Sequence, residues 1–311
     1  MKTIVTLTIN PAIDKSTSVE HVVAERKLRC NTPRHRPGGG GINVSRAIHN
    51  LGGDSLALYP AGGTVGKRLR DLLDEEGIKH QWTAIQDTTR ENLMVLDEAT
   101  NVQYRFGMPG AQMHETEWRQ LLDELPLISP RPDYIVASGS LPPGVPDDFY
   151  VRAAGVAKDL GARFIVDTSG EALRAIVQAG GAYLLKPNMR EIAELAGHQI
   201  RDDPDLEQAT MDIVKQGQAE VLVVSIGAAG ALLVSKDGHR RLHAPPVPIK
   251  SKIGAGDSMV AGIVLSLARG KPLLDAVRFG VAAGSAAVMV TELCSKEDTE
   301  RLYQQMSAEK A

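Results

Sequence analysis

The chain lacks several features that would indicate a secreted, membrane or nucleic-acid-binding protein. Its 311 residues include only two cysteines, Cys30 and Cys294, which excludes a disulfide framework and a cysteine-based zinc site. No apolar run approaches the ~20 residues that a membrane span needs. The formal net charge is −3, too small to indicate a surface that binds nucleic acid or an anionic membrane. We therefore expect a cytoplasmic protein with no nucleic-acid and no membrane partner.

The chain does contain short apolar runs that alternate with helix-type segments. The predicted strands are Thr3–Ile9, Tyr134–Ala137, Phe164–Asp167, Tyr183–Lys186, Val221–Ser225 and Ala231–Val234. The predicted helices are Ile42–Leu51, Lys67–Glu76, Thr116–Leu125, Asp147–Leu160, Arg190–Ala196 and Leu206–Gln216, with helices almost throughout Asp257–Met306. Several strand candidates are apolar throughout, which is typical of strands buried on both faces. This alternation predicts an α/β fold with a doubly wound, mostly parallel sheet flanked by helices.

Two segments interrupt this alternation. Ser16–Arg36 is polar and mixed, and Asn92–Phe106 has the pattern of two strands around a turn near Ala99–Asn101. Neither segment can bury a core alone, so we predict that residues 14–36 and 88–108 form a small β-sheet lid. No low-complexity linker or internal repeat divides the chain, which favours a single domain over residues 1–311.

The run Gly254-Ala255-Gly256-Asp257 is the most informative local motif. It follows a proline-rich loop and opens a segment with apolar residues at helical spacing. A glycine turn at a helix N-terminus aims backbone N–H groups at one point and attracts a phosphoryl group. A carboxylate at the same place can take the proton of an attacking hydroxyl. The alternative is that Asp257 only caps the helix.

A second constellation, Lys186 to Glu191, follows a buried-type strand and so lies at the sheet edge where α/β folds bind ligands. Asn188 and Glu191 are three residues apart and share a helix face. An amide oxygen and a carboxylate suit a hydrated Mg²⁺, and Lys186 could neutralise a phosphate. The alternative for Asn188 and Glu191 is a capping box without a ligand.

The remaining candidates concern an acceptor site. Four glycines, Gly38–Gly41, precede a helical pattern and permit a ligand to approach the backbone closely, with Asn43 near the helix start. The alternative is that this glycine run is only a flexible loop or hinge. Polar groups also occur on the predicted lid and after the strand that ends at Ser138: Asp14, Lys27, Arg90, Asn92, Arg105 and Ser140. Arginine clamps phosphate through two parallel hydrogen bonds, although any one of these residues could equally be a solvated surface charge.

Four motifs in order carry a resemblance to a known family. Asn10–Asp14, Gly38–Asn43, Lys186–Glu191 and Gly254–Asp257 resemble the signatures of the ribokinase-fold (PfkB) carbohydrate kinases, and Ser138–Gly144 and Asp167–Leu173 also match. The resemblance covers essentially the whole chain. It implies a ribokinase-like fold, ATP as co-substrate with Mg²⁺, and a homodimer formed through the lid.

The resemblance also implies a role for each matching position. Asp257 is the expected general base, beside an anion hole formed by Gly254, Ala255 and Gly256. Positions expected along the nucleotide are Lys186, Asn188, Ser225, Gly227 and Gly284, with Asn188 and Glu191 positioning Mg²⁺. Positions expected at the acceptor are Asp14, Gly39, Asn43 and Asn92. Positions expected to hold the phosphate already on the acceptor are Lys27, Arg90, Arg105 and Ser140.

Several cations on lid segments favour a sugar phosphate over a neutral sugar as the acceptor. The expected reaction is ATP-dependent phosphorylation of a ketohexose 6-phosphate at its C1 hydroxyl. A tagatose-6-phosphate kinase is the alternative within the family, and a nucleotide- or sugar-binding regulator without catalysis is the alternative outside it.

Relatives that bind a monovalent cation carry an Asn- and Gly-bearing loop after the last core helix. This chain lacks both residues there, which argues against potassium activation, although Ser251 and Ile253 could still supply oxygens.

Overall fold

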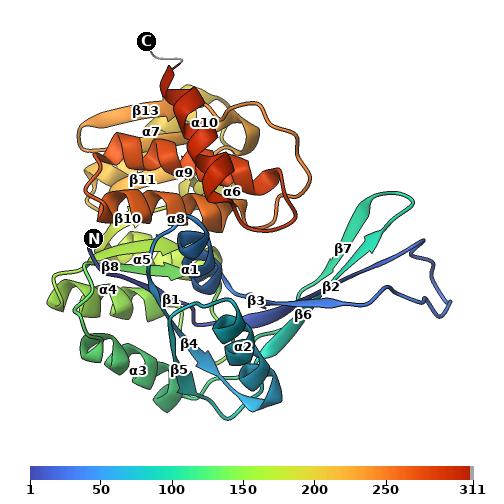
Figure 1. Ribbon diagram of the computed structural model, residues 1–311. Coiled ribbons are helices and arrows are strands. Elements are labelled where there is room, and N and C mark those ends of the chain that lie inside the picture. The colour runs from blue at the N-terminus through green and yellow to red at the C-terminus, as the bar shows by residue number, and fades with distance from the viewer. Residues whose placement is uncertain (309–311) are drawn as a thin grey trace.

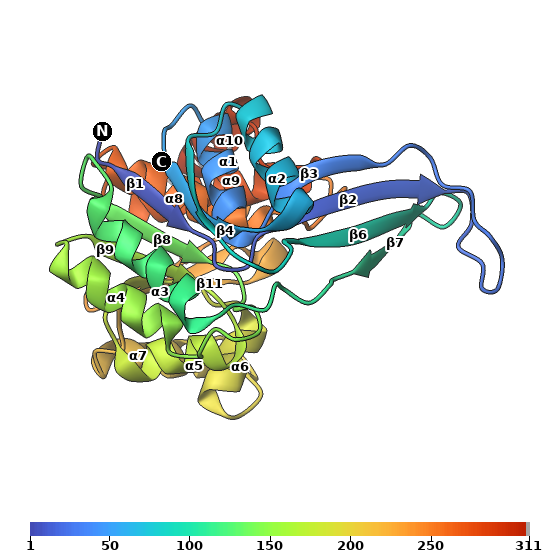
Figure 2. The same cartoon turned by 90° about the horizontal axis from the view of Figure 1, so that it is seen from below.

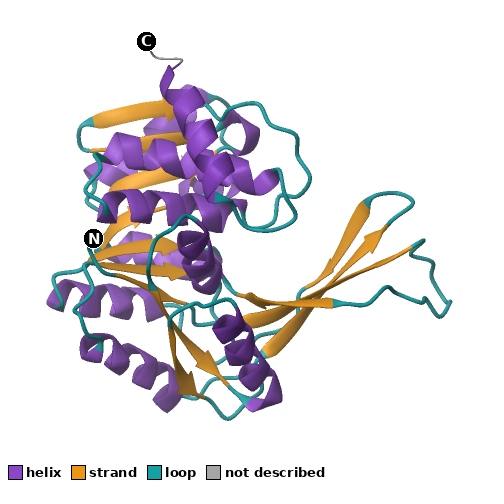
Figure 3. Ribbon diagram, in the orientation of Figure 1, coloured by secondary structure: helices purple, strands orange, loops and turns teal. Residues whose placement is uncertain are grey.

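The computed structural model describes residues 1–308, and the last three residues of the predicted 1–311 domain lie outside the described part. Its main body is a nine-stranded sheet covered by helices on both faces (Figures 1 and 3). The strand order is β13-β12-β11-β10-β9-β8-β1-β4-β5. All neighbouring pairs from β5 to β11 are parallel, whereas β12 and β13 are antiparallel additions. The predicted mostly parallel α/β sheet is therefore confirmed.

The strands of this sheet are short and mostly apolar. They are β1 (Ile4–Leu7), β4 (Leu56–Ala61), β5 (His80–Ala84), β8 (Tyr134–Ser138), β9 (Arg163–Asp167), β10 (Ala182–Leu185), β11 (Ala219–Ser225), β12 (Ala231–Ser235) and β13 (Gly238–Leu242). Successive side chains of a strand point to opposite faces. In β8, Ile135 and Ala137 join one core cluster, whereas Tyr134 and Val136 join the other. This alternation buries both faces and explains why the central strands are apolar throughout.

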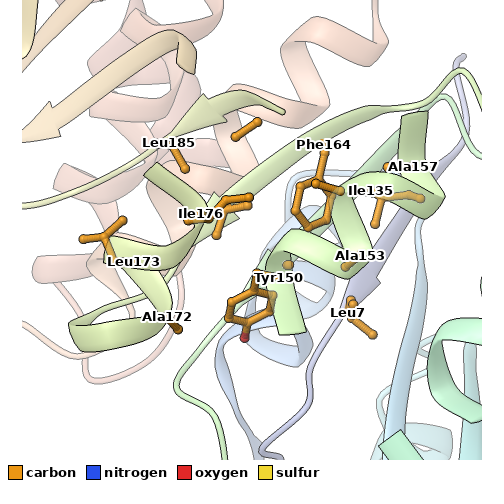
Figure 4. Packing of buried hydrophobic residues seen from close by; sticks show 14 of the residues in the cluster. Leu7, Ile135, Tyr150, Ala153, Ala157, Phe164, Ala172, Leu173, Ile176 and Leu185 are labelled. Atoms are coloured by element: carbon orange, nitrogen blue, oxygen red, sulfur yellow. The ribbon is translucent and has the colours of Figure 1, made fainter. Parts of the chain in front are cut away.

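Helices form two layers around the sheet. The first layer is α3 (Glu115–Glu124), α4 (Phe149–Asp159), α5 (Gly170–Ala179), α6 (Met189–Ala196) and α7 (Asp203–Lys215). The second layer is α1 (Gly40–Asn50), α8 (Ala255–Ala268), α9 (Leu273–Val288) and α10 (Lys296–Ala308), with α2 (Gly63–Glu75) beside α1. Figure 4 shows part of the first layer, where Tyr150 and Ile176 pack near Phe164 of β9. In the described residues no helix is long and apolar enough to cross a bilayer.

A second, smaller sheet projects from the body (Figures 1 and 2). Its order is β3-β2-β6-β7, with bounds β2 (Ala12–Val19), β3 (Arg34–Gly38), β6 (Arg90–Asp97) and β7 (Val102–Phe106). The turn between β6 and β7 covers residues 98–101, as expected. The two predicted lid segments therefore do combine into one sheet, which begins just after β1 ends.

The sequence did not reveal every element. β4, β5, β13 and helix α5 were absent from the predicted elements. Strand β4 contains Pro60, which argues against a strand, while the edge strands β5 and β13 carry polar or charged residues. Strand β4 pairs with β1 and β5, which lie far from it in sequence, so its local pattern is weak. Strand β13 pairs only with β12, across a tight turn, and its polar residues hid it.

Candidate active site

The carboxyl ends of the parallel strands meet at one edge of the main sheet, and the predicted motifs gather there. Lys186 follows β10, Ser225 ends β11, and Ser140 follows β8. Gly254 adopts a left-handed backbone (φ 73°) at the N-cap of α8, so that Ala255, Gly256 and Asp257 form its first turn. A glycine is needed at such a φ, and the free N–H groups of the turn make a partly positive site.

The side chain of Asp257 is half-buried and faces α1. Its Oδ2 accepts a hydrogen bond from Nδ2 of Asn43 at 3.0 Å. Burial, reinforced by the nearby Asp167 carboxylate, raises the pKa of Asp257 to about 7, while Asn43 and Lys186 oppose the rise. A carboxyl group with a pKa near neutrality is suited to accept a proton in a reaction at physiological pH.

Lys186 is buried beside this turn. Its Nζ lies 3.1 Å from Oδ1 of Asp167, the last residue of β9. Burial disfavours the ammonium charge, but the ion pair with Asp167 and the nearby carboxylates of Glu191 and Asp257 together outweigh it and hold the pKa of Lys186 above its ordinary value. A Cβ atom added to Gly256 would come within 3.5 Å of this Nζ. This distance is an ordinary van der Waals contact, so Gly256 in the first turn of α8 lies directly beside the lysine.

Asn188 and Glu191 form the capping box that the sequence offered as an alternative. Asn188 Oδ1 accepts from the Glu191 N–H at 3.0 Å, and Glu191 Oε2 accepts from the Asn188 N–H at 2.8 Å. Ser225 lies beside them through a backbone bridge to Asn188. The box uses one carboxylate oxygen of Glu191 and leaves the second for another ligand. Over residues 1–308, no group of three or more His, Cys, Asp or Glu side chains could hold a metal by protein ligands alone.

An acceptor-sized cavity of about 400 Å³ opens between the lid and the N-terminus of α8. Five of the predicted acceptor residues line it, together with Gly254 from the predicted anion hole: Asp14, Asn43, Arg90, Asn92 and Arg105. The cavity volume matches that of a small-molecule site. The structure therefore brings together residues from β2, α1, β6 and β7 that are separated by up to 91 positions in the sequence.

The polar groups of the cavity are held in place by neighbouring elements. Asn92 donates to Asp14 Oδ1 at 2.8 Å and accepts from the Met108 N–H at 3.1 Å, which fixes the Asp14 carboxylate across the β2–β6 pair. Arg90 donates to the carbonyl oxygens of Met108 and Asn10, at 3.0 and 3.2 Å. Because both acceptors are neutral, the guanidinium charge remains available to an anion.

Other predicted residues lie outside this cavity. Lys27 is exposed in the loop between β2 and β3 and does not line it. Ser140 is exposed and accepts from Asn10 Nδ2 at 3.2 Å. Gly39 caps α1 with a φ of 107°. Gly227 opens a short 3₁₀ turn after β11 and is exposed. Gly284 is buried on α9, where an added Cβ would come within 3.1 Å of the Ala255 carbonyl oxygen.

Sequence reasoning missed four charged groups at the site. Asp167, which pairs with Lys186, ends a buried strand at the ligand-binding edge, and that position was the available signal. Arg36 of β3 and Glu292, in the loop after α9, form an ion pair at the cavity mouth. Arg46 lies one helical turn beyond Asn43 and also lines the cavity. The spacing of three residues could have indicated contact with Asn43.

Comparison with known proteins agrees with this geometry. The profile of the pfkB family carbohydrate kinases matches residues 4–300. The chain is 44% identical over 309 residues to ATP-dependent 6-phosphofructokinase isozyme 2 of Escherichia coli, covering 99% of this chain and 100% of that one. It is 43% identical over 303 residues to the isozyme 2 of Mycobacterium tuberculosis, covering 97% and 89%.

Solved structures give the same picture. The crystal structure of E. coli phosphofructokinase-2 in complex with fructose-6-phosphate superposes with a TM-score of 0.93 at 44% identity, covering 99% of this chain and 100% of that one. Ribokinase of Arabidopsis thaliana has a TM-score of 0.76 at 18% identity, covering 98% and 99%, and supports the ribokinase-like fold. The family profile, the identity over nearly the full length and the residues at the sheet edge lead to one conclusion: the chain belongs to the pfkB family of carbohydrate kinases.

Proposed function

We propose that the protein catalyses the ATP-dependent phosphorylation of a ketohexose 6-phosphate at its C1 hydroxyl, as a 6-phosphofructokinase. The observation that carries this proposal is the position of Asp257 in the first turn of α8, where it accepts a hydrogen bond from Asn43, which lines the cavity together with Arg90 and Arg105. The names of the relatives at 43–44% identity support the same acceptor.

In this mechanism the chain supplies position and charge. Asp257 accepts the proton of the C1 hydroxyl as the phosphoryl group transfers. The N–H groups of Gly254, Ala255 and Gly256 stabilise the charge on that group, and Lys186 adds a positive charge beside it. Closure of the lid excludes water, the competing acceptor.

When bound with ATP, Mg²⁺ would neutralise charge on the phosphates of the nucleotide. Asn188 and Glu191 are the residues that would hold the hydrated ion. The second carboxylate oxygen of Glu191 suits an ion that keeps most of its waters. Burial raises the pKa of Glu191, so a nearby cation would favour its ionised form.

The proposal is tested by measuring ADP release with MgATP against fructose 6-phosphate, tagatose 6-phosphate, fructose 1-phosphate and ribose. We expect the highest kcat/KM with fructose 6-phosphate. A preference for tagatose 6-phosphate would assign the alternative kinase within the family. A preference for ribose would contradict the role of the lid cations, and ligand binding without ADP release from any acceptor would indicate a regulator.

Potassium dependence is a separate part of the proposal. E. coli phosphofructokinase-2 has been solved in complex with potassium. In this chain the hydroxyl oxygen of Ser251, one of the residues that could supply oxygens to a cation, already accepts from the Ile253 N–H at 3.1 Å. This bond competes with a cation for that oxygen, so we expect less than about twofold activation when KCl replaces tetramethylammonium chloride at equal ionic strength. Stronger activation would contradict this expectation.

The proposed assembly is a homodimer formed through the lid, in the cytoplasm. Strand β7 is an edge strand whose Val102, Tyr104 and Phe106 are large, exposed apolar residues. Exposed apolar side chains on an open edge are typical of a surface that pairs with another chain. An inhibited tetrameric form is described for E. coli phosphofructokinase-2.

A further inference from the structure

The side chain of Arg46 lines the acceptor cavity and contacts Asn43, the residue that donates a hydrogen bond to Asp257. Only 12% of it is exposed. Its Nη2 donates to Oε1 of Glu76 at 2.7 Å, while its Nε donates to Oε2 of the same carboxylate, so one edge of the guanidinium is held by both carboxylate oxygens. Its Nη1 donates to the Pro37 carbonyl oxygen at 3.1 Å and to Oδ1 of Asn43 at 3.4 Å. These contacts leave the guanidinium little freedom to rotate.

The contact with Asn43 decides which way its amide points. An amide has one oxygen, which accepts, and one NH₂ group, which donates. Since Arg46 donates to the oxygen of Asn43, the NH₂ group faces the other way and donates to Asp257 Oδ2 at 3.0 Å. A flipped amide would place its oxygen against a carboxylate and its NH₂ group against a guanidinium, and both contacts would be repulsive.

We propose that Arg46 is a positioning residue, which holds the amide of Asn43 and thereby keeps the carboxylate of Asp257 oriented toward the acceptor. Arg46 acts through Asn43, and Glu76 anchors Arg46 from the C-terminal end of α2. The inference rests on the proposed function, because it assigns a supporting role in that same proton transfer.

The electrostatics of the site show why the orientation of Asn43 matters. Asp257 faces Asp14 from the lid strand β2, Asp167 at the end of β9 and Lys186 after β10, and the two carboxylates disfavour its ionisation. The hydrogen bond from Asn43 favours the ionised form, which is the form that accepts a proton. Loss of that bond raises the pKa of Asp257 further and leaves less base at neutral pH.

The test compares Arg46→Met with Glu76→Gln, which weakens the anchor but keeps the guanidinium. For Arg46→Met we expect kcat to fall about tenfold or more, as misplacement of a reacting group does. The acid limb of the kcat–pH profile should move up by about half a unit or more. Glu76→Gln should also lower kcat and move the acid limb to higher pH, but both effects should be smaller than in Arg46→Met. Arg68→Met, which breaks the exposed Arg68–Glu75 pair on α2, is the matched control and should leave both unchanged.

The outcomes separate the alternatives. A raised KM for the sugar phosphate with an unchanged pH profile would mean that Arg46 binds the acceptor directly, and would overturn the proposal. Unchanged kinetics in both variants would overturn it as well. If Arg46→Met does not fold, judged by circular dichroism, the profile of Glu76→Gln decides: a shift supports the proposal and no shift refutes it. Failure of the wild-type enzyme to phosphorylate any acceptor would instead refute the proposed function.

Discussion

Asp257 is the residue whose protonation should control turnover. Its pKa is raised to about 7, so the carboxyl group is protonated below that pH and cannot accept the acceptor's proton. We expect kcat to increase as pH rises through about 7 and then to level off. Asp257→Asn should lower kcat by ~10²-fold or more at every pH, as loss of a general base typically does. Turnover close to that of the wild type would show that another group is the base.

Asp257→Asn, which should lower turnover, should at the same time raise the stability of the fold. A carboxyl group with a raised pKa in the folded state destabilises the fold as pH rises from the unfolded value of 3.8 through the folded value of about 7. Asp257→Asn removes this penalty. We therefore expect the melting temperature of the variant to exceed that of the wild type at pH 8, with a smaller difference at pH 5. An equal difference at both pH values would argue against a raised pKa.

Arg90 should act on the acceptor rather than on ATP. It lines the acceptor cavity, and its guanidinium is held by two neutral carbonyl oxygens. Arg90→Ala removes a charged partner of the sugar phosphate, so we expect its KM to rise by about tenfold or more while the KM for ATP changes little. Initial rates with each substrate varied in turn measure both constants. Similar increases in both would contradict acceptor clamping.

At the scale of elements, the packing of α8 on α9 supports the active site. Gly262 of α8 lies directly against Gly280 of α9, since a Cβ on Gly262 would come within 2.9 Å of the Gly280 Cα. A Cβ on Gly280 would lie 2.4 Å from Ile263. We expect Gly280→Ala to lower the free energy of unfolding by about 1–3 kcal/mol through overpacking.

A glycine elsewhere provides the control for that substitution. Gly155 is exposed on α4, and an added Cβ there would meet nothing within 4 Å. Gly155→Ala should stabilise the protein by roughly 0.5–1 kcal/mol, because alanine is the better helix former. Chemical denaturation measures both variants. If the two substitutions have similar effects, the close contact between α8 and α9 does not limit stability.

The elements also show what a sequence can predict. Strands β1, β8, β9, β10 and β11 were predicted because they are central and apolar, and helix α8 because of its apolar spacing. The motif Gly254–Asp257 could be placed at a helix N-terminus for the same local reasons. The contacts of Asp257 with Asn43 and of Lys186 with Asp167 could not be predicted, since they depend on how distant elements pack.

At the scale of the whole molecule, the lid should control assembly. Tyr104 on β7 is 39% exposed and does not line the acceptor cavity. If β7 forms the predicted dimer contact, Tyr104→Glu should convert the dimer to a monomer, because a buried unpaired charge opposes association. Sedimentation velocity measures this. Leu127→Glu, at an apolar side chain that is 78% exposed on the main body, is the control and should leave the assembly unchanged. A Tyr104→Glu variant that remains dimeric would place the contact elsewhere.

The acceptor cavity has one wall from the projecting sheet and another from helix α1, the turn that begins α8 and the loop after α9. The wall with Asn43 and the turn of α8 belongs to the body that the large core stabilises, whereas Asp14, Arg90 and Arg105 are carried by the projecting sheet. Selection for a new sugar can therefore exchange Arg90 or Arg105 on the projecting sheet without disturbing the main core, whereas Asp14 also affects the ionisation of Asp257. Divergence of substrate choice within one lineage should accordingly concentrate in those strands.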